Sequence, residues 1–310
     1  MSYFCSGDRL VQHMWPQYLS AHMDTLLDKA ELAQWAVVPD TYDGICDWAI
    51  AMPLEEGRPN ESTLLYAGED TPSAEGKPVR VCVVVHGVVE SVNLRALGNY
   101  KGRINAAQRA VQYITLASGG WQDAFHAQVH TLGRLREYLG VVFKSTVHDP
   151  AHTPGTIHFS RPVFTPRVPR TDERQARTGA SSVLRLGDDP EGLAEAIKRH
   201  WVVGHRVRTG IAKTGKAAAT CIREGDFVAV AASVDIIKTQ RGREWRTEMR
   251  LSVREVSRIM SAEELRSHSP AAAVTSPSVK GGASRSRPLE LTVLGVEEDT
   301  SGDEGDIVMH

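Results

Sequence analysis

The chain has 310 residues, of which 41% are hydrophobic and 24% are charged, as in folded globular proteins. Its formal net charge is −2, which excludes a molecule that is basic throughout, so a polyanion site would need a local excess of Lys and Arg. The widely spaced Cys5, Cys46, Cys82 and Cys221 include no CxxC pair, which argues against a zinc site or a disulfide framework.

These features favour a reducing, intracellular compartment, nuclear or cytoplasmic. The first residues contain no long apolar run, and no window approaches about 20 apolar residues. We therefore expect neither a signal peptide nor a membrane span.

Residues 1–159 are predicted to form a mixed α/β domain. Apolar residues recur at helical spacing over 8–36, which predicts a helix there. The β-branched run VRVCVVVHGVVESVNL (79–94) predicts a buried strand, or two strands that meet at Gly87, and a shorter strand is expected at 63–67.

Residues 104–139 are predicted to form two helices that meet at the paired glycines of SGG (118–120). The apolar face of the second helix would carry Trp121, Phe125, Val129, Leu132 and Leu139.

Histidines are the main metal-capable side chains of this half. His86 lies inside the predicted strand and is expected in the core, whereas His126 and His130 lack the Glu of an HExxH motif and are expected on the surface. The densest cluster is His148, Asp149, His152 and His158. Its spacing matches no known ligand pattern, so we predict no metal.

Enzyme motifs are absent in any convincing context: GxSxG, GxGxxG, HExxH and DxD are not found. Gly210 precedes Gly215 and Lys216 at Walker-loop spacing, but Ala217 replaces the Ser or Thr that would hold the metal. Cys82 and His86 lack an orienting third residue. We therefore expect no enzyme, no catalytic residue and no cofactor.

A boundary is predicted next. Residues 160–187 are rich in proline and arginine and should form an extended linker. A helix is expected over 188–201, where Asp188 or Asp189 can cap and Pro190 suits the first turn.

The most regular pattern lies in residues 224–259, which predict a hairpin with Gly242 in its turn. The first strand buries Val228, Val230, Ala232, Val234 and Ile236. The core face of the second strand carries Trp245, Thr247, Met249, Leu251 and Val253, and the opposite face Arg246, Glu248, Arg250, Ser252 and Arg254.

Charge is segregated along the second half of the chain. Residues 198–258 contain fourteen Lys or Arg against six acids, a net charge of +8. Residues 263–310 are expected to be disordered, and their last part, 289–310, contains seven acids and no Lys or Arg.

The stretch REGDFVAVAASVDIIKTQRGREWRTEMRLSVREVSRI resembles the late hairpin of OB-fold proteins of the single-stranded-DNA-binding kind. In that family a GD-hydrophobic-V-x-V strand is followed by a basic loop and a second strand that ends in a short helix. The order of basic β module, Ser/Pro/Gly linker and acidic tail is also similar to bacterial single-strand-binding protein. The resemblance covers residues ~200–260 only.

The sequence patterns together with this resemblance predict an α+β chain in which a mixed N-terminal domain precedes a small antiparallel, OB-like barrel module (188–262) and a disordered acidic tail. It also implies a single-stranded nucleic acid as the partner, bound by a basic sheet face. The predicted binding residues are Arg206, Arg208, Lys213, Lys216, Lys238, Arg241, Arg243, Trp245, Arg246, Arg250 and Arg254.

Three alternatives stay open. The arginines can belong to a solvated hairpin face, where Glu248 and Glu255 neutralise them. The chain can be an oligomeric scaffold of a virus or mobile element, or an enzyme without a recognisable motif. The acidic tail can compete with nucleic acid for the basic face or recruit a protein partner.

Overall fold

The computed structural model describes residues 1–23, 28–53, 60–70, 78–102, 104–148, 153–166, 201–203, 207–212, 215–241 and 244–268. The predicted helix at 188–201 except Trp201, the predicted disordered tail from residue 269 onward and most of the predicted linker lie outside these ranges. The first residues of that tail, 263–268, were wrongly predicted to be disordered, because they belong to a helix, α5 (Ala262–His268). Within the described ranges, no helix is both long enough and apolar enough to cross a membrane.

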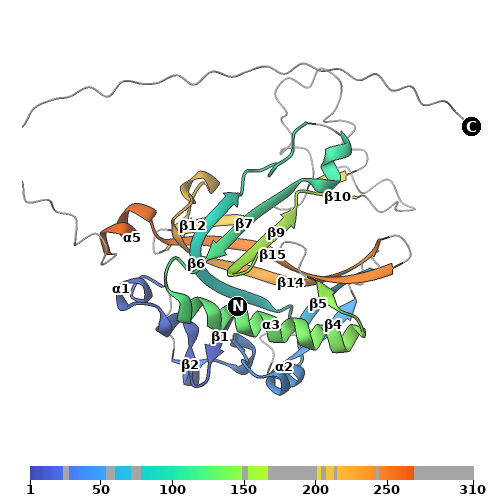
Figure 1. Ribbon diagram of the computed structural model, residues 1–310, viewed down its shortest axis with the longest axis horizontal. Helices are drawn as coiled ribbons and strands as arrows, with labels where there is room; N and C mark the ends of the chain where they lie inside the picture. The colour runs from blue at the N-terminus through green and yellow to red at the C-terminus, as the bar shows by residue number, and fades with distance from the viewer. Residues whose placement is uncertain are drawn as a thin grey trace, which may run out of the picture.

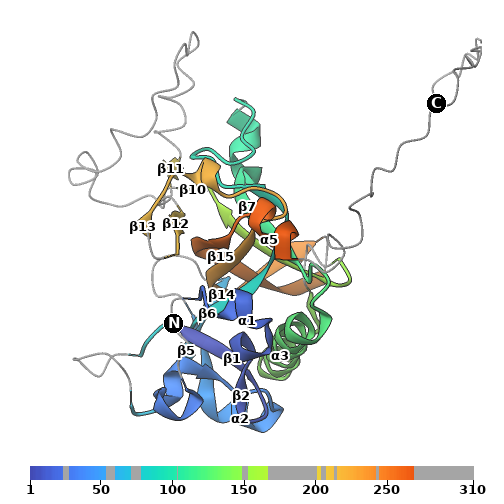
Figure 2. The same ribbon diagram turned by 90° about the vertical axis from the view of Figure 1, so that its left-hand side faces the viewer.

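The described part of the chain is an α+β structure made mainly of strands (Figures 1 and 2). Its helices are α1 (Gln17–Ser20), α2 (Tyr42–Trp48), α3 (Gln122–Phe143) and α5 (Ala262–His268), with short 3-10 segments at Val11–Met14, Lys29–Glu31, Gln34–Ala36, Ile104–Arg109 and Ala219–Cys221. The strands of the large sheet are β1 (Ser2–Ser6), β2 (Arg9–Leu10), β3 (Val37–Val38), β4 (Ala49–Pro53), β5 (Glu61–Tyr66), β6 (Cys82–Asn93), β7 (Val111–Ala117), β8 (Val147–His148), β9 (Thr156–Pro162), β12 (Arg208–Ile211), β13 (Gly215–Lys216), β14 (Phe227–Arg241) and β15 (Glu244–Met260). A separate pair joins β10 (Phe164–Pro166) to β11 (Trp201–Val203).

Five strands of the large sheet pair in a closed cycle. β14 pairs with β6, β6 with β7, β7 with β9, β9 with β15, and β15 again with β14. Four of these pairings are antiparallel. The fifth, between β9 and β15, is parallel and rests on one register pair, Phe159 beside Leu251.

β14 and β15 are the longest strands of the described residues, and they form a hairpin that runs across the width of the molecule (Figure 1). Alternation predicted its buried side correctly, because Val228, Val230, Ala232, Val234 and Ile236 are all 0–1% exposed. Thr247, Met249, Leu251 and Val253 are buried as predicted on β15. We call this side of the hairpin the core face.

Helix α3 confirms the second of the two helices predicted over 104–139. Phe125, Leu132 and Leu139 are 0–2% exposed, and the helix ends at Lys144, whose left-handed backbone (φ 49°) stops the repeat. Its C-terminal end packs against the core face, where Ser145 Oγ lies 2.7 Å from Thr247 Oγ1.

Along one edge of β6 the neighbouring strand changes from β1 to β7, and a side chain of α3 contacts the stretch between the two pairings. One edge of β6 pairs with β1 at Val83–Val84 and with β7 from Val88 onward. Between them, the Gln128 side chain accepts from the His86 backbone N–H (2.8 Å) and donates to the His86 carbonyl (2.9 Å). Gln128 therefore replaces the missing strand partner.

The two halves predicted as separate domains share this sheet. β6, from the range 1–159, pairs with β14, from the range 188–262, over seven consecutive residues of each strand. One hydrophobic core also contains side chains of both ranges, such as Phe125 and Phe227. The predicted boundary at 160–187 therefore does not separate two cores among the described residues.

Two predicted helices are wrong. Residues 8–36 form β2 and several segments of three or four residues instead of one helix, because Pro16 ends the helical repeat and neighbouring strands organise the segment. Residues 111–117 form β7 rather than a helix. Its alternation was obscured by Gln112, which is 3% exposed because its amide donates to the carbonyls of Leu94 and Arg95.

Candidate nucleic-acid interface

The register of the sheet fixes which cations share a side, because directly paired residues project to the same face. Arg250 pairs with Asp235, and Arg246 projects to the same side of β15 two alternations away. A β-bulge opposite Ala231 makes Arg254 the extra residue of β15. Its Nε donates to Ser233 Oγ at 3.0 Å, which places it on the side of Asp235.

The same face continues into the neighbouring strands. Glu255 pairs with Arg208 of β12, and Gly210 of β12 pairs with Lys216 of β13. Arg80, just before β6, forms an ion pair with Asp235. We call this side the basic face; its cations are Arg80, Arg208, Lys216, Arg246, Arg250 and Arg254.

Helix α3 packs on the other side of the hairpin, so the basic face is the side turned away from it. Arg208, Lys216 and Arg246 are exposed, and Arg250 and Arg254 are half-buried. The predicted sharing of one face by Arg246, Arg250 and Arg254 is therefore confirmed.

Two predicted binding residues lie on the opposite side. Lys238 pairs with Thr247 of the core face, and its Nζ lies 4.9 Å from the centre of the Phe143 ring of α3. Trp245 also follows the core-face alternation, but it is 56% exposed rather than buried, because β15 extends past the end of the core. Neither side chain shares a surface with the arginines of β15.

Three carboxylates lie on the basic face, namely Glu248 and Glu255 of β15 and Asp235, which pairs with Arg250. Asp235 accepts from Arg80 and from the Ser252 hydroxyl, and Ser233 Oγ lies 3.4 Å from its Oδ1. Burial lowers the pKa of Arg254, and the positive charge of Arg80 lowers it further. Positive charge therefore exceeds negative charge around Asp235.

Arg161 at the end of β9 lies near this group without sharing its face. It is two residues beyond Phe159, which is beside Leu251 of the core face, so the alternation directs Arg161 to the core-face side. Burial lowers the pKa of Arg161, and the charge of Arg254 is the next largest cause. Arg161 was predicted to lie in the linker, and Arg80 was not among the predicted binding residues, although the strand predicted at 79–94 includes it.

The glutamates of the hairpin have partners beyond the arginines of their own strand. Glu255 pairs with Arg208 of β12, at 2.9 Å between Nη2 and Oε2. Glu248 is only 7% exposed, and its Oε1 accepts from Thr239 at 3.3 Å. The face is thus partly buried rather than evenly solvated.

Four other predicted binding residues are not placed in this surface. Arg206, Lys213 and Arg243 lie outside the described residues. Arg241 is described only by its backbone, as the last residue of β14.

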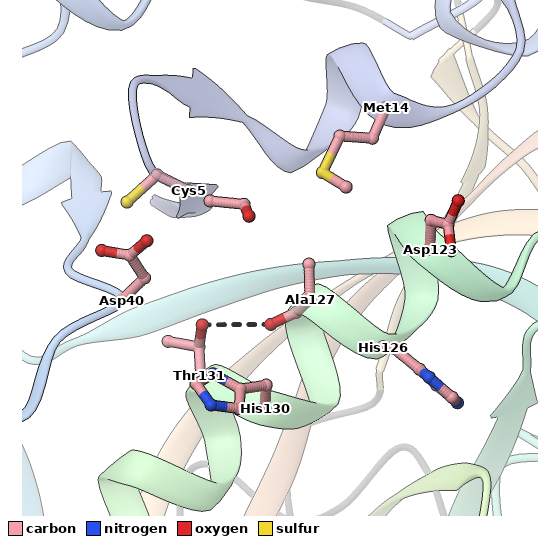
Figure 3. Close-up of a pocket in the computed structure, with 9 residues that line it drawn as sticks. Cys5, Met14, Asp40, Asp123, His126, Ala127, His130 and Thr131 are labelled. Carbon is pink, nitrogen blue, oxygen red and sulfur yellow. Dashed lines mark hydrogen bonds between the residues drawn. The ribbon is translucent and has the colours of Figure 1, made fainter.

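The histidines of α3 line a separate cavity of about 400 Å³ between the N-terminal segment and the helix (Figure 3). Its lining residues include Cys5, Asp40, His126, His130 and Thr131. Within the described ranges, no three His, Cys, Asp or Glu side chains come together in a way that could hold a metal ion. Of the predicted loop cluster, Asp149 and His152 lie outside the described residues, and His158 Nδ1 lies 3.0 Å from Thr115 Oγ1.

His86, expected in the core, is buried there at 5% exposure. Its ring stacks on Phe227 with 6.4 Å between centres. Burial lowers the pKa of His86 to about 4.

No protein-family model matches this chain, and no curated protein matches it in sequence. Among solved structures, it is similar to gp2.5, the single-stranded DNA binding protein encoded by bacteriophage T7, with a TM-score of 0.33 and 10% identity over 65% of this chain and 98% of that one. It is also similar to the single-stranded DNA-binding protein of bacteriophage Enc34, with a C-terminal truncation (TM-score 0.31, 13% identity, 68% and 95% covered) and in complex with ssDNA (0.30, 11%, 67% and 94%). These proteins are of the class that the hairpin sequence resembles.

Proposed function

We propose that the chain binds single-stranded nucleic acid along its basic face. The observation that carries this proposal is the register, which gathers cations from β12, β13, β15 and the entry to β6 on one side of one sheet. Such a surface, in a chain with a net charge of −2, is a local polyanion site.

The strand order supports a barrel for this purpose. The closed cycle of five strands, antiparallel except at one contact, is what an OB-type barrel requires, and we propose that β6, β7, β9, β14 and β15 form one. The barrel would thus draw three strands from the first half of the chain, rather than lie within residues 188–262 alone.

The length of the basic face fits several nucleotides. Residues on one face of a strand repeat every 6.5–7 Å or so, so Arg246 and Arg254 lie roughly 25 Å apart along β15. A strand of nucleic acid in this direction would pass Arg246, Arg250, Arg254 and then Arg208. Each phosphate contact would release counterions, so affinity would fall with salt.

The direct test is fluorescence anisotropy of a labelled oligodeoxythymidine in a salt series, with wild type and the double variant R246A/R250A. Loss of two phosphate contacts should flatten the slope of log K against log salt by about 1.4 and weaken binding at low salt. The control, R9A/R134A, removes one cation from β2 and one from α3, the helix that packs on the side of the hairpin opposite the basic face. An equal slope for both variants would contradict the proposal.

The same experiment can test a role for the acidic tail. We propose that residues 289–310 compete for the basic face, so a chain that ends at residue 288 should bind more tightly at low salt. Unaltered affinity would assign the tail to a protein partner instead.

A further inference from the structure

The sheet that carries the basic face ends in an exposed apolar strip. On β4, Ala49 and Ala51 pack against the core, whereas Ile50 and Met52 project to the other side and are 45% and 41% exposed. Leu65 of β5 pairs with Ile50 and is half-buried. We call Ile50, Met52 and Leu65 the apolar shelf.

The shelf and the arginines belong to one face. Ile50 pairs with Leu65, and Leu65 bridges to Arg80. A second row runs from Met52 through Thr63 and Asp235 to Arg250. Because neighbouring strands are about 4.8 Å apart, Ile50 lies roughly 10 Å from Arg80 and Met52 roughly 14 Å from Arg250.

These spacings match the shape of an unpaired nucleic-acid strand, which has a charged backbone on one side and flat, largely apolar bases on the other. We propose that the apolar shelf contacts the bases of a strand whose phosphates lie on Arg80 and Arg250. Bases in a duplex are stacked and paired, so the shelf would favour single strands over duplex. This inference rests on the proposed function and adds to it the residues that select the unpaired form.

Charge favours this occupant over a second protein chain. The shelf is directly beside Arg80, whose side chain is 34% exposed although it forms an ion pair with Asp235. An anionic ligand beside the shelf would form charged hydrogen bonds with the exposed part of this guanidinium, as a purely apolar partner would not. Burial of two exposed apolar side chains under bases would add binding free energy that does not depend on salt.

The test is the double variant I50T/M52T, since threonine suits a strand and removes apolar surface. Affinity for an oligodeoxythymidine of about 20 nucleotides should fall about 5- to 10-fold, while the salt slope stays that of wild type. Affinity for a duplex of the same length should not change. R80A, in contrast, should flatten the slope.

The matched control is V141T/V142T, which alters two other exposed apolar residues, on α3, at 65% and 43% exposure. It should bind like wild type. Wild-type affinity of I50T/M52T for single strands would overturn the inference, as would equal losses for single strands and duplex.

Sedimentation velocity tests whether a second copy of the chain, rather than nucleic acid, covers the shelf. A wild-type dimer that becomes a monomer in I50T/M52T would make the shelf a contact between copies and overturn the inference. Failure of wild type to bind any oligonucleotide at low salt would instead remove the proposed function itself.

Discussion

The carboxylate of Asp235 offsets part of the positive charge of the basic face. Its carboxylate accepts from Arg80 and Ser252 and lies close to Ser233, so it holds the polar groups of three strand segments together. It is also the group that a phosphate would meet when it approaches Arg80. The same contacts that order the arginines therefore oppose an anion.

We expect Asp235→Asn to bind single-stranded DNA several-fold more tightly at low salt, because one negative charge leaves the path of the backbone. The variant should also lose about 1–2 kcal/mol of unfolding free energy with the charged hydrogen bonds. Anisotropy and urea denaturation measure the two effects. Asp47→Asn, an exposed change on α2, is the control. If Asp235→Asn and Asp47→Asn bind single-stranded DNA with the same affinity, the ligand lies elsewhere.

His86 makes stability depend on pH. Its pKa is about 4 in the folded protein and about 6.5 when unfolded, so the unfolded chain binds the proton first as pH falls. Its contribution is therefore complete above pH 6.5 and is lost towards pH 4, by about 2 kcal/mol between pH 7 and pH 5. Urea denaturation of wild type and His86→Gln should show a shallower pH dependence for the variant. Parallel curves would mean that other groups dominate.

At the scale of elements, the junction between α3 and β6 depends on one side chain. Gln128 is 0% exposed and makes two hydrogen bonds to the backbone of His86, where β6 has left β1 and not yet reached β7. A helix thus completes the edge of a strand. Removal of that side chain leaves a buried N–H and a buried carbonyl without partners.

Gln128→Ala should therefore lower the free energy of unfolding by about 2–4 kcal/mol, which urea denaturation can measure. Gln122→Ala, an exposed change in the first turn of the same helix, should change it by less than about 0.5 kcal/mol. A loss in Gln128→Ala no greater than in that control would show that water satisfies the junction.

The contrast between elements explains what the sequence could predict. The hairpin was predictable because a period of two over ten residues has no helical alternative, and it also predicted that Arg246, Arg250 and Arg254 share a face. β7 was missed because Gln112 is buried by hydrogen bonds to distant carbonyls. Arg80 was not predicted as a binding residue, because its position on this face depends on its bridge to Leu65 and its ion pair with Asp235, which are distant in the sequence.

At the scale of the molecule, the early and late strands of the described chain belong to the same sheet, so neither half forms a separate one. β14 has β15 on one edge and both β5 and β6 on the other, so the hairpin joins early and late strands. The apolar side chains of both halves meet in one core. Unfolding should accordingly occur as a single transition.

A fragment of residues 1–166 should then lack cooperative thermal unfolding, because β6 has lost β14 and β9 has lost β15. Circular dichroism during heating measures this, with the full chain as reference. Addition of a 201–268 fragment should restore the transition if the pairing is the missing element. A sharp transition in the first fragment alone would show an independent domain.

Because β6 pairs with β14, β6 is synthesised well before the strand that completes one of its edges. Val88 leaves the ribosome about 140 residues before its partner Phe227, an interval of roughly 7–28 s at ordinary translation rates. During that time the valine-rich strand has no neighbour on one edge. The nascent chain must stay unaggregated through this interval, so its yield in cells should respond to chaperone supply more than its final stability would indicate.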